Sequence, residues 1–147
     1  MARRERAASE KMELLRGIPL FSGCTPHELA RLAQLFDEGR RAAGTVLIHE
    51  GRPGSEFFVI VEGRAEATLR GQHLATLTPG DFFGEMSLLE VAPRAATVVA
   101  ETDLSLLVLE PRGFASLLAI APTVGMKMMR SMSQRLRAIE TVSAAAY

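Results

Sequence analysis

The sequence is short of the residues that mark secreted and metal-binding proteins. It holds no tryptophan, one tyrosine and one cysteine in 147 residues. Cys24 alone cannot form an internal disulfide, and a thiolate metal site needs several cysteines, so a reducing cytoplasm is the expected compartment. The three histidines, His27, His49 and His73, are isolated from one another. Metal-dependent enzymes built on small β-barrels need clustered ligands such as a His-x-His pair, so we predict no metal centre.

An excess of charge of one sign is also missing, as are long hydrophobic runs. Seventeen Lys and Arg residues balance 17 Asp and Glu residues. This balance excludes the basic footprint of a protein that neutralises many phosphates. The N-terminus begins with charged residues and no apolar signal segment follows. The longest uncharged stretch, residues 113–126, is broken by Pro122 and is shorter than the ~20 residues of a membrane-spanning helix. We therefore expect neither direct nucleic-acid binding nor membrane insertion.

Both ends of the chain have helical patterns. Residues 3–16 are rich in helix formers, and a second helix is predicted from Pro26 to about Phe36. Its start is well specified, because Thr25 supplies an N-cap and Glu28 the acid of a capping box. Two further helices are predicted over residues 111–120 and 123–143, with Pro122 as the break between them.

The middle of the chain has a period near two, in short runs separated by glycine or proline. The predicted strands are residues 45–49, 56–62, 65–70, 73–77, 97–100 and 104–109. Strands this short and this regularly spaced are typical of a closed antiparallel barrel or jelly roll. We expect one mainly β domain over residues 1–147, an antiparallel jelly roll over 39–110 with an N-terminal helical segment over 1–38 and C-terminal helices over 111–143.

One interval interrupts the strand rhythm, and its residues point to a phosphate diester. A helical turn is predicted over residues 85–90, and Gly84 before it lets a ligand approach the backbone. Arg94 follows Pro93 on a stiffened backbone, and its planar guanidinium matches two phosphate oxygens. Glu85 suits a hydroxyl donor such as a ribose 2′-OH. The alternative is that Glu85 and Arg94 only form an ion pair that staples the loop.

The same interval resembles a known sequence motif. Residues 83–89 read FGEMSLL and residues 93–97 read PRAAT. This pattern resembles the phosphate-binding cassette of the cyclic nucleotide-binding domain family, which includes catabolite activator proteins, regulatory subunits of cAMP-dependent protein kinase and cyclic nucleotide-gated channels. The resemblance extends across nearly the whole chain and places the cassette at residues 82–97. It implies a cyclic nucleotide ligand, with Glu85 and Gly84 on the ribose and with Arg94, Ala95 and Ser87 on the cyclic phosphate.

The resemblance also suggests which residues contact the base. A threonine hydroxyl after the cassette arginine favours guanine in this family, and this chain has Ala95 there. The predicted ligand is therefore cAMP, with cGMP as the alternative, and no other cofactor is expected. By resemblance, the base is expected to contact Arg135, Phe83, Leu74 and Ala67.

Arg135 stands out because it interrupts an apolar stripe on the last predicted helix. The other members of this stripe are Val124, Met128, Met132, Leu136 and Ile139. A charge in such a stripe is costly unless it reaches water or a partner. Arg135 either stacks on the purine, as an arginine does in some channel-type members, or extends to water at the edge of a helix–helix contact.

The sequence thus predicts a regulatory sensor without catalytic residues, in which ligand binding moves the C-terminal helices. The expected partners are the cyclic nucleotide and either a second copy of the chain, paired through the last helix, or an effector domain or partner chain. One alternative is a structural or dimerisation module of the same fold without a ligand. Another is a sensor domain taken from a larger transcription regulator, channel or enzyme.

Overall fold

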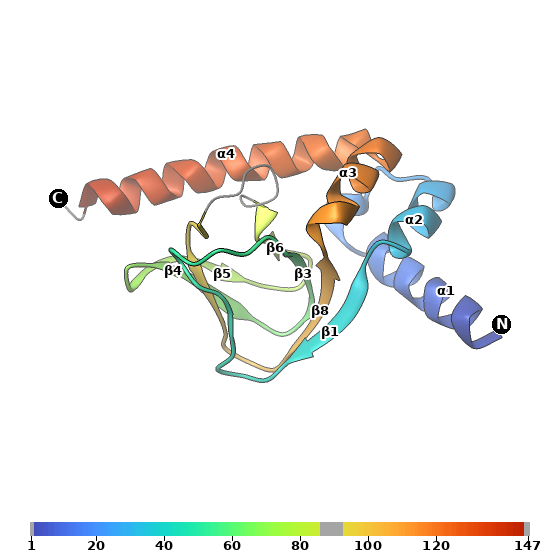
Figure 1. Cartoon of the computed structure of the whole chain (residues 1–147), viewed down its shortest axis with the longest axis horizontal. Coiled ribbons are helices and arrows are strands. Elements are labelled where there is room, and N and C mark those ends of the chain that lie inside the picture. Colours follow the sequence, from blue (N-terminus) through green and yellow to red (C-terminus); the bar gives the residue numbers. More distant parts are fainter. Residues whose placement is uncertain (1, 86–92, 146–147) are drawn as a thin grey trace.

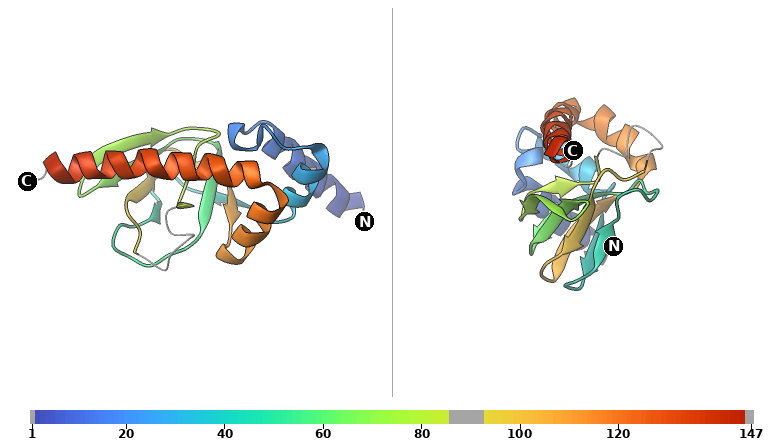
Figure 2. Two further views of the ribbon diagram at one scale, coloured as in Figure 1. Left: turned by 90° about the horizontal axis from the view of Figure 1, so that it is seen from above. Right: turned by 90° about the vertical axis from the view of Figure 1, so that its left-hand side faces the viewer.

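The fold consists of a β-roll crossed by one long helix. We analysed a computed structural model, which describes residues 2–85 and 93–145, with side chains described within 9–85 and 93–141. In Figure 1, helix α4 (Pro122–Ala145) runs along the top of the roll, while α1 (Ala2–Arg16), α2 (Pro26–Ala33) and α3 (Pro111–Ile120) gather at one end of it. Figure 2 shows the same arrangement from above and along α4. None of the helices in the described ranges is long and apolar enough to cross a membrane.

Two four-stranded antiparallel sheets form the roll, as the strand spacing predicts. One sheet has the order β1-β8-β3-β6 and the other has the order β2-β7-β4-β5. The strands are β1 (Asp37–Arg41), β2 (Val46–Ile48), β3 (Phe57–Glu62), β4 (Ala65–Leu69), β5 (Gln72–Leu77), β6 (Phe82–Phe83), β7 (Thr97–Ala100) and β8 (Leu104–Leu109). The mainly β architecture expected from the sequence is therefore confirmed.

Two of these strands are not predicted by periodicity. Strand β1 reads DEGRR and has no alternation of apolar and polar residues. It forms because its backbone pairs with β8 along its whole length, from Asp37 opposite Val108 to Arg41 opposite Leu104. Strand β6 has only two residues, which pair with β3. In both cases the partner strand decides the structure, because β preference depends on context more than helix preference does.

The helices follow their local sequence signals closely. The predicted capping box of α2 is present: the Thr25 hydroxyl accepts a hydrogen bond from the Glu28 amide at 3.1 Å, and the Glu28 carboxylate accepts one from the Thr25 amide at 2.8 Å. Helix α2 ends at Ala33, before the predicted end at Phe36, although Phe36 is still buried. Pro122 is the first residue of α4 rather than a break outside it.

Helix α4 contributes to two regions with different packing. Its N-terminal half carries Val124 and Met128 into a core formed with the other helices and with Phe57. Farther along, Leu136 keeps 47% of its surface exposed, so the predicted apolar stripe is buried at its N-terminal end and not throughout. A second hydrophobic cluster fills the roll itself and includes Phe58 and Phe83. The C-terminal half of α4 lies above the roll (Figure 1), and the helix contacts β5, which supplies Leu77 to that cluster.

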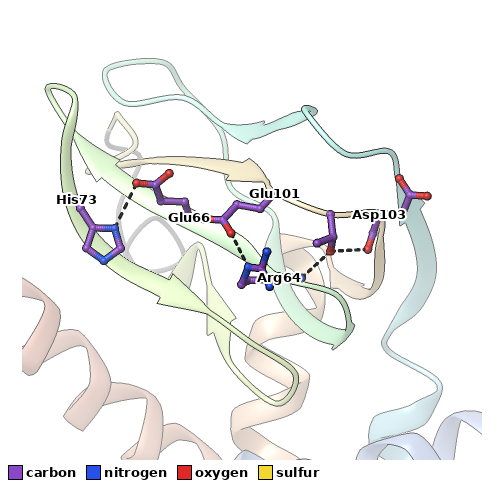
Figure 3. Close-up of polar contacts among 6 residues, drawn as sticks. Arg64, Glu66, His73, Glu101 and Asp103 are labelled. Atoms are coloured by element: carbon purple, nitrogen blue, oxygen red, sulfur yellow. Dashed lines mark hydrogen bonds and ion pairs between the residues drawn. The ribbon is translucent and has the colours of Figure 1, made fainter.

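The turn between β3 and β4 is closely packed. Gly63 has a φ of +96°, and a Cβ there would lie 2.3 Å from the carbonyl oxygen of Asp103. Figure 3 shows the polar contacts beside this turn, where the Arg64 amide donates to the Thr102 hydroxyl and the Arg64 side chain pairs with Glu101. Only glycine fits such a position, because both the backbone conformation and the space exclude a side chain.

We predict that Gly63→Ala destabilises the fold much more than Gly71→Ala. Gly71 has a similar φ of +78°, but nothing lies within 4 Å of its added Cβ. Gly71→Ala should therefore show the left-handed strain of about 1 kcal/mol. The free energy of unfolding of Gly63→Ala should fall by a further ~2 kcal/mol, because the added Cβ clashes with the backbone. Urea denaturation of both variants measures their free energies of unfolding. If both variants lose the same amount of stability, the close packing at Gly63 does not exclude a side chain.

Candidate functional site

A pocket opens between the inner face of the roll and the C-terminal half of α4. The space in and at the mouth of this pocket is about 620 Å³, of which only part is enclosed. Apolar side chains of the strands, of the segment before β7 and of α4 form most of its wall: Ile48, Ala67, Leu74, Ala75, Leu77, Phe83, Ala95, Ala96, Val98, Ala138 and Ile139. The charged residues in the lining are Glu85, Arg94 and Arg135. The described part of the pocket is therefore an apolar chamber with its charge concentrated on three side chains.

Arg94 is buried at this site, with 6% of its surface exposed. Its Nη1 donates to the carbonyl oxygen of Gly84 at 3.3 Å, and its Nη2 donates to that of Glu56 at 3.0 Å. Burial lowers the pKa of the Arg94 guanidinium, while the more distant charges of Glu56 and Glu85 oppose this effect. No ion pair to Arg94 forms within the described ranges. Its hydrogen-bond acceptors there are neutral, so no described carboxylate is directly paired with its positive charge.

Gly84 allows this arrangement because it has no side chain. Its φ is +91°, and a Cβ would lie 2.5 Å from the Glu56 carbonyl oxygen and 3.2 Å from Nη1 of Arg94. The sequence predicts Gly84 as a point of ligand approach, and the structure adds a second reason for glycine. The residue brings two backbone segments close enough for both to accept hydrogen bonds from one guanidinium.

Glu85 is also buried, and it pairs with an arginine from α4 rather than with Arg94. Its side chain is 1% exposed, and Nη1 of Arg135 lies 2.6 Å from each of its carboxylate oxygens. Arg135 also donates to the Phe82 carbonyl, and its guanidinium carbon lies 5.1 Å from the centre of the Phe82 ring. The alternative in which Glu85 and Arg94 staple the loop as an ion pair is therefore wrong. The sequence contains no local signal for the observed pair, because its members are 50 residues apart.

Burial raises the pKa of the Glu85 carboxyl above its ordinary value of 4.5, and the charge of Arg135 opposes this shift. The Arg135 side chain is 30% exposed, so this guanidinium remains partly hydrated. Arg135 thus neither extends freely to water nor lies in a helix–helix contact. It bridges α4 to the segment that carries the predicted ribose-binding residue.

The remaining predicted site residues lie around the same chamber. Ala67, Leu74 and Phe83 line it from the strands, and Ala95 lines it beside Arg94. Phe83 is 3% exposed and stacks on Phe58, with ring centres 4.9 Å apart. Ser87 and most of the predicted helical turn over residues 85–90 lie outside the described residues.

Sequence reasoning missed several residues of the chamber wall. Ile48 and Val98 face inward from the strands, and Ala138 and Ile139 reach the pocket from α4. The alternation of β7 could have assigned Val98, whereas the α4 residues depend on how that helix lies across the roll. Within the described part of the chain, no group of three or more His, Cys, Asp or Glu side chains could hold a metal ion.

Comparison with known proteins agrees with this geometry. The family model for the cyclic nucleotide-binding domain matches residues 39–120, more than half of the chain. The chain belongs to the cyclic nucleotide-binding domain family. A relative, the cAMP-dependent protein kinase regulatory subunit of Aspergillus fumigatus, is 41% identical over 106 residues, which are 71% of this chain and 26% of the relative. The chain thus spans about a quarter of the length of the curated relatives it matches.

Solved structures of similar proteins have the same fold. A structure described as cAMP-bound PfPKA-R superposes with a TM-score of 0.87 at 25% identity, covering 95% of this chain and 48% of that one. A second is described as the regulatory subunit of a cAMP-independent protein kinase A from Trypanosoma brucei. It has a TM-score of 0.77 at 26% identity and covers 88% of this chain and 46% of that one. The jelly-roll fold expected from the sequence is therefore shown, and it occurs both in a structure described as bound to cAMP and in the regulatory subunit of a kinase described as cAMP-independent.

We predict that Glu85→Gln stabilises the chain increasingly, relative to the wild type, as the pH rises above about 4.5. The folded-state pKa of Glu85 lies above the unfolded value, so the folded state binds the proton more tightly. The contribution of Glu85 to the free energy of unfolding is fully present below pH 4.5 and is lost as the pH rises through the folded-state pKa. The glutamine of the variant stays neutral at every pH, so the variant does not lose this contribution to stability as the pH rises.

Thermal denaturation of both proteins between pH 4 and pH 8 measures this difference, with Glu62→Gln as an exposed control. A difference in melting temperature that stays flat or shrinks with pH would show that the attraction to Arg135 outweighs the cost of burying Glu85.

Proposed function

We propose that this chain is a regulatory module that binds a cyclic nucleotide, and that its ligand is cAMP. The observation that carries the proposal is the buried Arg94, whose described hydrogen-bond acceptors are two neutral carbonyls. A buried charge without an opposite charge is costly, and a bound anion lowers that cost. A cyclic phosphate carries one negative charge and offers two oxygens, which a guanidinium binds well.

The surrounding residues suit the rest of the nucleotide. Glu85 and Gly84 are proposed to bind the ribose, with the carboxylate accepting a hydrogen bond from the 2′-hydroxyl. Ala95 and Ser87 are proposed to complete the phosphate site with their backbone groups. The base is proposed to lie against Ala67, Leu74, Phe83 and Arg135, where the wall is mainly apolar. Family membership and the name of the A. fumigatus relative support cAMP as the ligand.

Binding at this site is proposed to act through α4. Arg135 contacts the carboxylate that the ribose would also use, so the ligand changes the balance of contacts that hold the helix. A ligand shifts a conformational equilibrium by its difference in affinity for the two states. The module itself is proposed to have no catalytic activity, no direct nucleic-acid contact and no resident metal. Its output passes to a second copy through α4, or to an effector domain or partner chain. Its cytoplasmic location remains a prediction.

A second candidate is a structural module that binds no nucleotide. The T. brucei relative is described as the regulatory subunit of a cAMP-independent kinase, so this fold is not confined to proteins described as cAMP-dependent. In a module that binds no ligand, the cost of burying an arginine among neutral carbonyls at the edge of a pocket would not be offset by a bound anion. The presence of both Arg94 and Glu85 in the pocket lining therefore favours binding.

We predict that Arg94→Ala weakens cAMP binding by at least about 30-fold. Removing one charged partner of a buried phosphate contact costs about 2 kcal/mol or more, which corresponds to that factor. Isothermal titration calorimetry with cAMP measures the affinity of the wild type and the variant. The control is Arg112→Ala, which removes an exposed arginine paired with Glu110. If the wild type does not bind cAMP by calorimetry or by equilibrium dialysis, the proposed function is wrong.

We also predict that cAMP binds more tightly than cGMP. Ala95 has no hydroxyl to accept a hydrogen bond from the exocyclic amine of guanine, and the described wall near it is apolar. Guanine would therefore bury polar groups without partners. Displacement of a fluorescent cAMP analogue by each nucleotide gives the ratio of affinities. Displacement by cGMP at an equal or lower concentration would contradict the adenine preference.

A further inference from the structure

The guanidinium of Arg94 lies between two glycines that come from different parts of the chain. A Cβ on Gly84 would lie 3.2 Å from Nη1. On Gly54, a Cβ would lie 2.8 Å from Nε and 3.2 Å from Nη2. Side chains at these two positions would therefore meet all three nitrogens of Arg94. Gly84 belongs to the cassette, whereas Gly54 lies in the connection between β2 and β3, 40 positions before Arg94.

The connection that carries Gly54 also holds the backbone of Arg94. The Gly51 amide donates to the Arg94 carbonyl and the Arg94 amide donates to the Arg52 carbonyl, both at 2.9 Å. The Glu56 carbonyl, at the other end of the connection, accepts from Nη2. Backbone and side chain of one arginine are thus bound to the same short segment, so the position of its guanidinium depends on how closely that segment approaches.

A third set of contacts ties the start of this connection to the strand after Arg94. The carboxylate of Glu50 accepts a hydrogen bond from the Thr97 hydroxyl at 2.9 Å and from the Arg70 amide at 3.0 Å. The Glu50 amide in turn donates to the Thr97 hydroxyl at 3.1 Å. The segment 50–56 therefore contacts the strand that follows the arginine as well as the arginine itself.

Gly54 is exposed to solvent and has no positive φ. Neither its backbone conformation nor the space on its solvent side therefore requires glycine. The close contacts that an added Cβ would meet are those with the Arg94 side chain. A long side chain can turn aside at low cost, whereas a backbone group cannot. A methyl group at position 54 is therefore expected to displace the guanidinium and leave the fold intact.

We propose that Gly54 is a positioning residue for phosphate binding: the absence of a side chain at this position lets the connection between β2 and β3 hold the Arg94 guanidinium in the orientation that receives the cyclic phosphate. Gly54 does not touch the ligand in this arrangement, and it acts through Arg94. The ligand-binding part of this inference rests on the proposed function, whereas the placement of the guanidinium does not depend on it.

The test compares Gly54→Ala with Gly51→Ala. Gly51 lies in the same connection, and nothing lies within 4 Å of its added Cβ, although its φ of +80° makes the substitution strained. Gly54→Ala should weaken cAMP binding at least about tenfold, equivalent to one charge-assisted hydrogen bond. Gly51→Ala should stay within about threefold of the wild type. In an Arg94→Lys background the effect of Gly54→Ala should vanish, because the amine has no planar group to displace.

A second measurement needs no ligand. The Nε–H resonance of Arg94 in a ¹⁵N–¹H NMR spectrum, assigned by its loss in Arg94→Lys, should shift in Gly54→Ala and stay in place in Gly51→Ala. If the wild type does not bind cAMP, the proposed function is wrong, and the resonance still decides the role of Gly54. If the wild type binds cAMP but Gly54→Ala binds equally well or leaves the resonance unchanged, this inference is overturned. Loss of folding in Gly54→Ala would overturn it too.

Discussion

The burial of one guanidinium without an ion-pair partner among the described residues is the constraint on which the arrangement of this site depends. Arg94 is 6% exposed, and it is held there by the carbonyls of Gly84 and Glu56. Each carbonyl supplies a partial negative charge and a hydrogen bond, which reduces the cost of removing the guanidinium from water. Two backbone carbonyls can converge on one side chain only if both chain segments approach closely, and Gly84 permits that approach.

A second buried charge, Glu85, connects this constraint to the long helix. Its carboxylate is nearly inaccessible and is paired with Arg135, which α4 holds over the pocket. The pair fixes the register of α4 against β6, because Arg135 also donates to the Phe82 carbonyl. Leu136, the next residue along, is largely exposed, so the apolar contact of the helix is weak at this point. The position of the C-terminal half of α4 therefore depends more on a polar contact within the ligand site than on hydrophobic burial.

The parts of the structure that sequence predicts well are those determined by neighbouring residues. The capping box at Thr25 and the strand over 104–109 follow from local pattern and are found where expected. The motif around Arg94 likewise identifies the family. By contrast, β1 has no strand pattern of its own and depends on β8 for its pairing. The Glu85–Arg135 pair joins residues far apart in the chain, so no local spacing could assign it.

Gly54 illustrates why a site can be only partly visible in a sequence. In the sequence, Gly54 belongs to the segment GRPG, which predicts a turn. A predicted turn gives no indication that the residue lies near the ligand site. Its closeness to Arg94 arises only after two strands have brought residues 50–56 beside residues 94–97.

The fold alone does not determine a dependence on cAMP, because the regulatory subunit described as belonging to a cAMP-independent kinase has it too. Which ligand a member binds therefore depends on the side chains placed on the common fold. In this chain the described pocket lining contains two guanidiniums and one carboxylate, a local excess of one positive charge. This excess of one positive charge matches a singly charged phosphate diester. A chain with no net charge can supply it, because the positive electrostatic field is needed at one buried point and not over the whole surface.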